Sequence, residues 1–144
     1  MSVFAAKIIV ALVAVYLIGL GAIALANADT AKRYLLAHAA SPLAHYLELS
    51  VRATCGWAIL TMSPYVLEPG IFKMVGWVIL ISTAVLLVLP WRVHRNFAKW
   101  SVPQAVQYMN LIAIGSLLGG LLMAYALISS SAVEPANLLS GTAA

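Results

Sequence analysis

Long apolar runs, nearly free of charge, decide what this chain can fold into. The clearest run covers residues 3–26 and is interrupted only by Lys7. A membrane-crossing helix needs about 20 mainly apolar residues to span about 30 Å of hydrocarbon. Charged residues make up 8% of this chain, whereas a soluble domain has about 25%. Too few charges remain to cover a water-facing surface, so lipid is the expected solvent.

The sequence predicts a single all-α domain, a bundle of four transmembrane helices, over residues 1–128. The expected spans are residues 3–26, 43–63, 71–89 and 103–128. The second span is the least apolar, and it starts after Ser41 and Pro42, which are typical of a helix N-terminus. It ends at Pro64 or kinks there. Residues 129–144 are expected to form a flexible outer tail.

The first run has a second interpretation, as a cleaved signal peptide. The small residues of "ALANA" at positions 24–28 have the spacing of a signal-peptidase site. The apolar run is longer than the usual core of about 7–15 residues, and cleavage would place the basic loops outside. An uncleaved anchor is therefore expected.

Basic residues set the expected orientation, because Lys and Arg are retained on the cytoplasmic side. The other side has only Lys7 and Lys73, whereas the first and third loops carry Lys32, Arg33, Arg92, Arg95 and Lys99. Loops one and three are thus predicted to be cytoplasmic and both termini to lie outside, in a multi-pass protein of the bacterial inner membrane. The net charge of +4 fits anionic lipid headgroups and requires no nucleic acid.

A repeated pentapeptide predicts a close contact between the second and third spans. "GWAIL" begins at Gly56 and "GWVIL" begins at Gly76. The short turn between the spans places the two glycines at nearly equal depth on antiparallel neighbours. Helices in lipid pack where small residues let their backbones approach, so these glycines are expected to meet.

The last span carries a denser glycine pattern. Gly115 and Gly119 form a G-x-x-x-G motif, and Ser116 and Gly120 form a second ridge one residue along. Such ridges serve packing within a bundle or contact with another chain. The sequence leaves both open.

Ionisable residues inside a span are costly and indicate function. They gather on the second span, where His45, Glu48 and Arg52 share one helical face and Glu48 and Arg52 form an i,i+4 pair. Asn110 on the last span is placed to line a cavity with them. These residues form either a structural ion pair near the interface or the polar site of a small transporter.

Catalytic and metal-binding patterns are not found. The sequence has no phosphate-binding glycine loop, nucleophile elbow, H-E-x-x-H motif or paired carboxylates. His38, His45 and His94 have no zinc spacing, and Cys55, the single cysteine, cannot form an internal disulfide. No catalytic residue, metal or cofactor is expected.

Loop three, "PWRVHRNFAKWSVP", is expected to contact lipid headgroups as an amphipathic helix in the headgroup plane. Loop one is predicted to form a similar short helix, capped by Asp29 or Thr30. The two loops together would form a cytoplasmic shelf. The expected headgroup contacts are Trp91, Arg92, Arg95, Lys99 and Trp100.

The whole chain resembles the small four-helix inner-membrane proteins common in proteobacteria. The shared features are an N-terminal anchor, "R-x-x-x-G" at residues 52–56, a span bounded by prolines at 69 and 90 and followed by Arg92 and Arg95, and the glycine-rich residues 115–120. The resemblance implies a four-helix fold and a location in the inner membrane, and it assigns no functional residue.

In layout the chain is also similar to the membrane-associated eicosanoid and glutathione metabolism enzymes. "AHYLELSVRA" and "WRVH" resemble the charged segments of that family. Its N-x-x-E pattern is absent, because His45 stands three residues before Glu48. The resemblance implies a glutathione-type transferase that would use Arg52, Glu48, Arg92 or Arg95. No binding site of that family is carried over to this sequence.

The function expected from the sequence is that of an accessory or assembly subunit, or a self-associating scaffold, in the inner membrane. Its expected partners are the lipid bilayer and other membrane proteins, as a homo- or hetero-oligomer. The transferase and the small transporter are the alternatives.

Overall fold

The computed structural model describes residues 1–38 and 41–140, and within them the side chains except those of 35–38, 94, 98, 102, 105–106 and 131–140. The described residues are helical, without a strand, which confirms the all-α class. The elements are α1 (Val3–Ala26), α2 (Ala28–His38), α3 (Pro42–Met62), the 3-10 helix η1 (Ser63–Tyr65), α4 (Pro69–Val88), α5 (Trp91–Val106) and α6 (Met109–Ser140).

Three helices, α1, α4 and the Met109–Ser130 part of α6, are long and apolar enough to cross a membrane. This finding identifies a candidate membrane protein. α3 is of similar length, with 21 residues, but it carries the polar residues noted above. The fourth span therefore stays a prediction.

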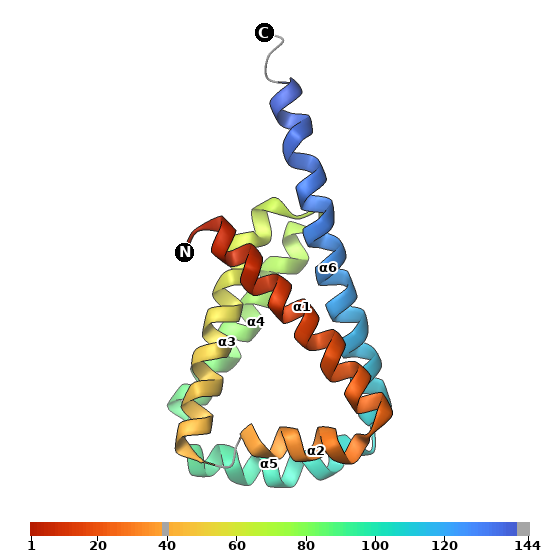
Figure 1. Cartoon of the computed structure of the whole chain (residues 1–144). Helices are drawn as coiled ribbons and strands as arrows, with labels where there is room; N and C mark the ends of the chain where they lie inside the picture. The colour runs from red at the N-terminus through yellow and green to blue at the C-terminus, as the bar shows by residue number, and fades with distance from the viewer. Residues whose placement is uncertain (39–40, 141–144) are drawn as a thin grey trace.

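The long helices form two antiparallel pairs, α1 with α6 and α3 with α4 (Figure 1). The pairs converge at the apex, the end of the molecule that holds η1. They diverge toward the base, where α2 and α5 lie side by side across the opening between them. The start of α1 lies at the apex, and α6 extends beyond the apex.

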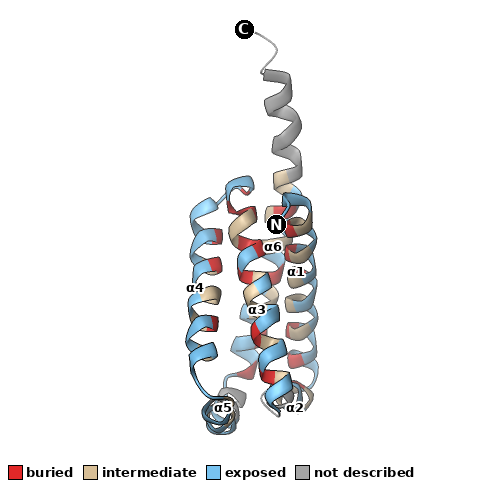
Figure 2. Ribbon diagram, turned by 90° about the vertical axis from the view of Figure 1, so that its left-hand side faces the viewer, coloured by how far each residue is buried: buried red, intermediate tan, exposed pale blue. Residues whose placement is uncertain are grey.

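The main core lies where the two pairs converge. Its buried members come from all four long helices and the turn after η1, and the buried faces of the helices turn toward one another (Figure 2). They are Ala6, Val10, Ala58, Ile59, Met62, Val66, Phe72 and Leu127. A second, smaller cluster of Ala24, Ala31, Met109 and Ala113 joins α1, α2 and α6 at one corner of the base. Three of the four members of this smaller cluster are alanines, which lets the backbones come close.

Capping residues explain where the helices begin. Ser2 and Ser41 accept hydrogen bonds from the backbone N–H three residues on, at 3.2 and 3.1 Å, which satisfies otherwise unpaired donors. Pro42 and Pro69 occupy the first helical position, where no N–H is needed. The cap of α2 is Asn27, whose Oδ1 accepts from the Thr30 N–H at 3.0 Å. The expected cap at Asp29 or Thr30 is therefore wrong.

The last span differs from its expected bounds. Residue 103 lies inside α5, which continues to Val106, and α6 begins only at Met109. The backbone turns between them, with Gln107 N–H donating to the Gln104 carbonyl. Proline is favoured at a helix start, but Pro103 lies inside α5, where it removes one backbone donor and crowds the carbonyl four residues earlier.

The expected tail at 129–144 is helical as far as Ser140, and residues 141–144 lie outside the described part. The serines after Ile128 do not end the helix. Ser130 donates its hydroxyl back to the Leu127 carbonyl at 2.8 Å, a bond that satisfies serine inside a helix.

Candidate functional site

Arg52 joins α3 to α4 through polar contacts. Its Nη2 donates to Ser82 Oγ at 2.8 Å and its Nε donates to Thr83 Oγ1 at 3.3 Å. Its Nη1 lies 3.8 Å from Oε1 of Glu48, one turn earlier on α3. Two neutral hydroxyls thus hold the guanidinium more closely than the carboxylate does. The predicted pairing of Glu48 with Arg52 is present in the structure, with side chains 19% and 36% exposed.

Two hydroxyls on α4 are oriented to receive Arg52. Ser82 and Thr83 both donate to the Ile79 carbonyl, at 3.0 and 2.6 Å. A hydroxyl has one donor and two acceptor sites, so each oxygen keeps lone pairs for the guanidinium. Ser82 and Thr83 were not among the site residues predicted from the sequence. Their signal is two adjacent hydroxyls inside an otherwise apolar run.

Two tyrosines extend the polar contacts to the other helix pair. Tyr34 on α2 donates its O–H to the Tyr16 hydroxyl on α1 at 3.3 Å. We call the set Tyr16, Tyr34, Glu48, Arg52, Ser82 and Thr83 the polar link. Within this set the two tyrosines join α1 to α2, and Arg52 joins α3 to α4 through Ser82 and Thr83.

The other polar candidates lie apart from Arg52. His45 is 1% exposed near the start of α3, where its ring meets the edge of Tyr46, with centroids 5.2 Å apart. Asn110 is exposed and adjoins Met109, at the corner that α6 shares with α1 and α2. The contacts that the structure gives Arg52 include neither residue. The expected cavity of Asn110 with Glu48 and Arg52 stays a prediction.

The repeated glycines lie at the contact between α3 and α4. A Cβ built on Gly76 would lie 3.2 Å from the Gly56 carbonyl oxygen and 2.7 Å from Leu60. A Cβ on Gly56 would lie 3.0 Å from Leu80. The structure thus brings the two glycines together, and a larger residue at position 76 would require the Leu60 side chain to shift.

On α6 the two glycine ridges have different surroundings. Ser116 and Gly120 face α1: the Ser116 hydroxyl donates to the Leu17 carbonyl at 2.9 Å, and a Cβ on Gly120 would lie 2.8 Å from the Ala14 carbonyl oxygen. A Cβ on Gly115 or Gly119 would meet nothing within 4 Å. The G-x-x-x-G ridge therefore faces away from the other helices that the structure describes.

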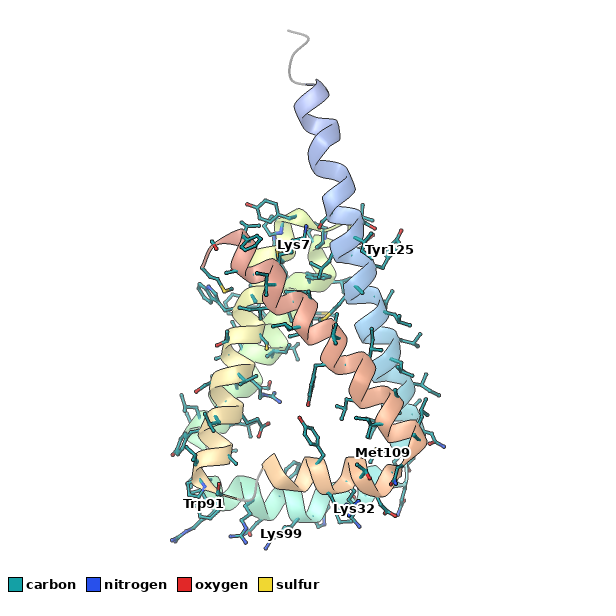
Figure 3. All side chains as sticks on the ribbon, viewed as in Figure 1. Lys7, Lys32, Trp91, Lys99, Met109 and Tyr125 are labelled. Carbon is teal, nitrogen blue, oxygen red and sulfur yellow. The ribbon has the colours of Figure 1, made fainter. Side chains whose placement is uncertain are left out.

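The base carries the basic and aromatic residues of α2 and α5. Lys32 and Lys99 lie along it (Figure 3). On α5 the Arg95 guanidinium lies 5.6 Å from the centre of the Trp91 ring, and the Phe97 and exposed Trp100 rings are 6.0 Å apart. Arg92 is exposed on the same helix. Neither Arg92 nor Arg95 is among the contacts that the structure gives Arg52, and the transferase alternative stays a prediction.

Two further features bear on chemistry. A surface depression of about 460 Å³ at the junction of α1 and α2 is lined by Asn27, Asp29, Lys32 and Arg33. Cys55 is a partly buried free thiol. Among the described residues no group of three or more His, Cys, Asp or Glu side chains is placed to hold a metal ion. His38 and His94 have side chains outside the described part.

The fold and the polar link define an all-helical protein with three helices able, by length and composition, to cross a membrane. Comparisons of the chain with protein-family models, with curated proteins and with solved structures found no match.

Proposed function

We propose that this chain is a self-associating scaffold or accessory subunit of the bacterial inner membrane. In this proposal α1, α3, α4 and α6 cross the bilayer, the base is cytoplasmic and both termini lie outside. Five basic residues at α2 and α5 support this orientation, because Lys and Arg are retained inside. The exposed apolar side chains along the long helices would then face lipid.

One observation carries the proposal: the open ridge on α6. A Cβ on Gly115 or Gly119 meets nothing within 4 Å, whereas the ridge beside it is filled by α1. A G-x-x-x-G ridge lets a second helix approach closely, which is how helices associate in lipid. The open ridge therefore fits a second copy of α6 or a helix of another membrane protein.

The base supports a role at the membrane surface. Helices α2 and α5 lie across it, and α5 presents exposed Arg92, Lys99 and Trp100. Basic side chains near anionic headgroups contribute about 1 kcal/mol each, and tryptophan favours the interface. These contacts would hold the two helix pairs at a fixed depth.

Leucine in place of Gly115 and Gly119 is expected to disrupt self-association without unfolding the chain. Overpacking an interface costs roughly 1–3 kcal/mol, so the dimer dissociation constant should rise about tenfold or more. Mass spectrometry of intact complexes released from nanodiscs measures the dimer fraction.

The matched control is Gly19→Leu on α1. Gly19 also has nothing within 4 Å of a built Cβ, but it belongs to no G-x-x-x-G ridge. The wild type and this control should give the same dimer fraction. A wild type that is monomeric at every concentration and co-purifies with no other protein would contradict the proposal.

A further inference from the structure

We propose that this chain fits, and imposes on the lipid around it, a hydrocarbon layer several ångströms thinner than that of an ordinary bilayer. Exposed aromatic and basic side chains gather at two levels of the molecule, and the aliphatic surface between the two levels is short. This partner is the lipid that the long helices contact, so the proposal rests on the proposed crossing of the membrane by α1, α3, α4 and α6. It does not depend on self-association through α6.

On the α3–α4 pair the apex level consists of two tryptophans and a lysine. Trp57 and Trp77 are 57% and 55% exposed. Each follows one of the two glycines that meet between the helices, where a Cβ on Gly76 would lie 3.2 Å from the Gly56 carbonyl oxygen, so the two rings lie at nearly equal depth. Exposed Lys73 is one turn before Trp77 on the same face. Tryptophan and lysine side chains favour the headgroup interface.

The α1–α6 pair carries a similar level. Tyr125 is 62% exposed, and Leu127, two residues on, belongs to the same core as Ile59, which lies two residues after Trp57. Because α3 and α6 both run from the base toward the apex, Tyr125 and Trp57 have similar depth. Lys7 also lies toward the apex (Figure 3). Interfacial side chains thus stand at one level on all four long helices.

The second level is the base. Trp91 and Lys99 lie there on α5 (Figure 3). Trp100 on the same helix and Tyr108, directly before α6, are each 63% exposed. Tryptophan and tyrosine are enriched at both membrane–water interfaces, so the two levels mark the two faces of the membrane.

The helix lengths between the two levels are short. At 1.5 Å per residue, α4 is about 17 Å long from Trp77 to its end at Val88, and α6 is about 24 Å long from Met109 to Tyr125. The large exposed side chains of α4 along this length are aliphatic: Val78, Ile81, Val85, Leu87 and Val88. An ordinary hydrocarbon core is about 30 Å thick, so the chain fits a layer thinner by about 6 Å or more.

Helix α1 is longer than this layer and still fits it. It has 24 residues, which makes it about 36 Å long. A helix that exceeds the local hydrocarbon thickness is accommodated by tilting. Figure 1 shows α1 running obliquely from the apex to the base, as a thin layer requires.

The relative affinity for phosphatidylcholines of different acyl length tests the proposal. The full chain is reconstituted in vesicles that mix brominated dioleoyl phosphatidylcholine with unlabelled dimyristoleoyl, dipalmitoleoyl or dioleoyl phosphatidylcholine. Quenching of tryptophan fluorescence then measures which lipid contacts the helices. Mismatch costs fractions of a kcal/mol per Å, so the short myristoleoyl lipid should displace the brominated lipid about twofold better than the dioleoyl lipid does.

The variant Lys73→Leu with Trp77→Leu removes the apex level from α4. The aliphatic surface of α4 would then continue to exposed Ile71, and the preference should move toward the longer lipids. The matched control is Tyr65→Leu, which removes a 53% exposed aromatic side chain from η1, beyond the level of Trp77. This control should keep the preference of the wild type.

The depth of Trp77 gives a second measurement, in a chain whose other tryptophans are phenylalanine. In dioleoyl vesicles, bromine close to the glycerol should quench Trp77 more than bromine near the chain ends. Stronger quenching by the deep bromine, highest affinity for the dioleoyl lipid, or equal shifts in the double variant and Tyr65→Leu would overturn the thin layer and leave the membrane crossing in place. A wild type that no brominated lipid quenches would contradict the crossing itself, and the thin layer with it.

Discussion

Replacing Gly120 with alanine is expected to lower the free energy of unfolding by about 1–3 kcal/mol, the usual cost of overpacking a close contact. The added Cβ would lie 2.8 Å from the Ala14 carbonyl oxygen and 3.0 Å from the Ile18 backbone nitrogen. Backbone atoms of a helix cannot rotate aside, so α1 and α6 would have to separate. Unfolding in mixed detergent micelles, followed by far-ultraviolet circular dichroism, measures the change.

Gly19→Ala is the matched control for this prediction. It adds the same methyl group to a helix of the same contact, but a Cβ there meets nothing within 4 Å. Alanine favours a helix over glycine by about 1 kcal/mol, so the control should be neutral or slightly stabilising. Equal losses from Gly120→Ala and Gly19→Ala would show that close approach of α1 and α6 does not limit stability.

The sequence predicted most of the long helices, because a run of about 20 apolar residues has few alternatives once lipid is the solvent. The proline and serine signals also placed the start of α3 correctly. The error at the last span has a local cause. Pro103 has the signature of a helix start, but the turn falls at Gln107, where no strong breaker stands.

The site was predictable only in part, because a helical pattern gives the face and depth of a residue but not the neighbour that it meets. Glu48 and Arg52 lie on one helix, so their spacing alone predicted the pair. Ser82 is thirty residues from Arg52, and no spacing rule connects them. The depth of Asn110 in the membrane suggested that it lies near Arg52. However, α6 packs on α1, which places Asn110 at the corner that α6 shares with α1 and α2.

Replacing Arg52 with methionine is expected to lower the free energy of unfolding by about 2 kcal/mol. Hydrogen bonds to a charged group contribute about 1.5–3 kcal/mol, and Arg52 makes two of them to α4. Its loss would also remove the guanidinium that lies 3.8 Å from the Glu48 carboxylate. Removing one partner of a fully buried pair costs about 3–5 kcal/mol, and partial exposure of Arg52 reduces that amount.

Glu48→Gln separates the two causes of that loss. Arg52 keeps its bonds to Ser82 and Thr83 in this variant, and the Glu48–Arg52 separation of 3.8 Å is long, so a cost of about 0.5–1 kcal/mol is expected. In the double variant the carboxylate is gone as well, and the total loss should be smaller than the sum of the two single losses, because an unbalanced charge no longer remains. The same micelle unfolding measurement gives all three values. If Glu48→Gln proved as costly as Arg52→Met, the ion pair within α3, rather than the hydroxyls of α4, would be the interaction that stabilises this half of the fold.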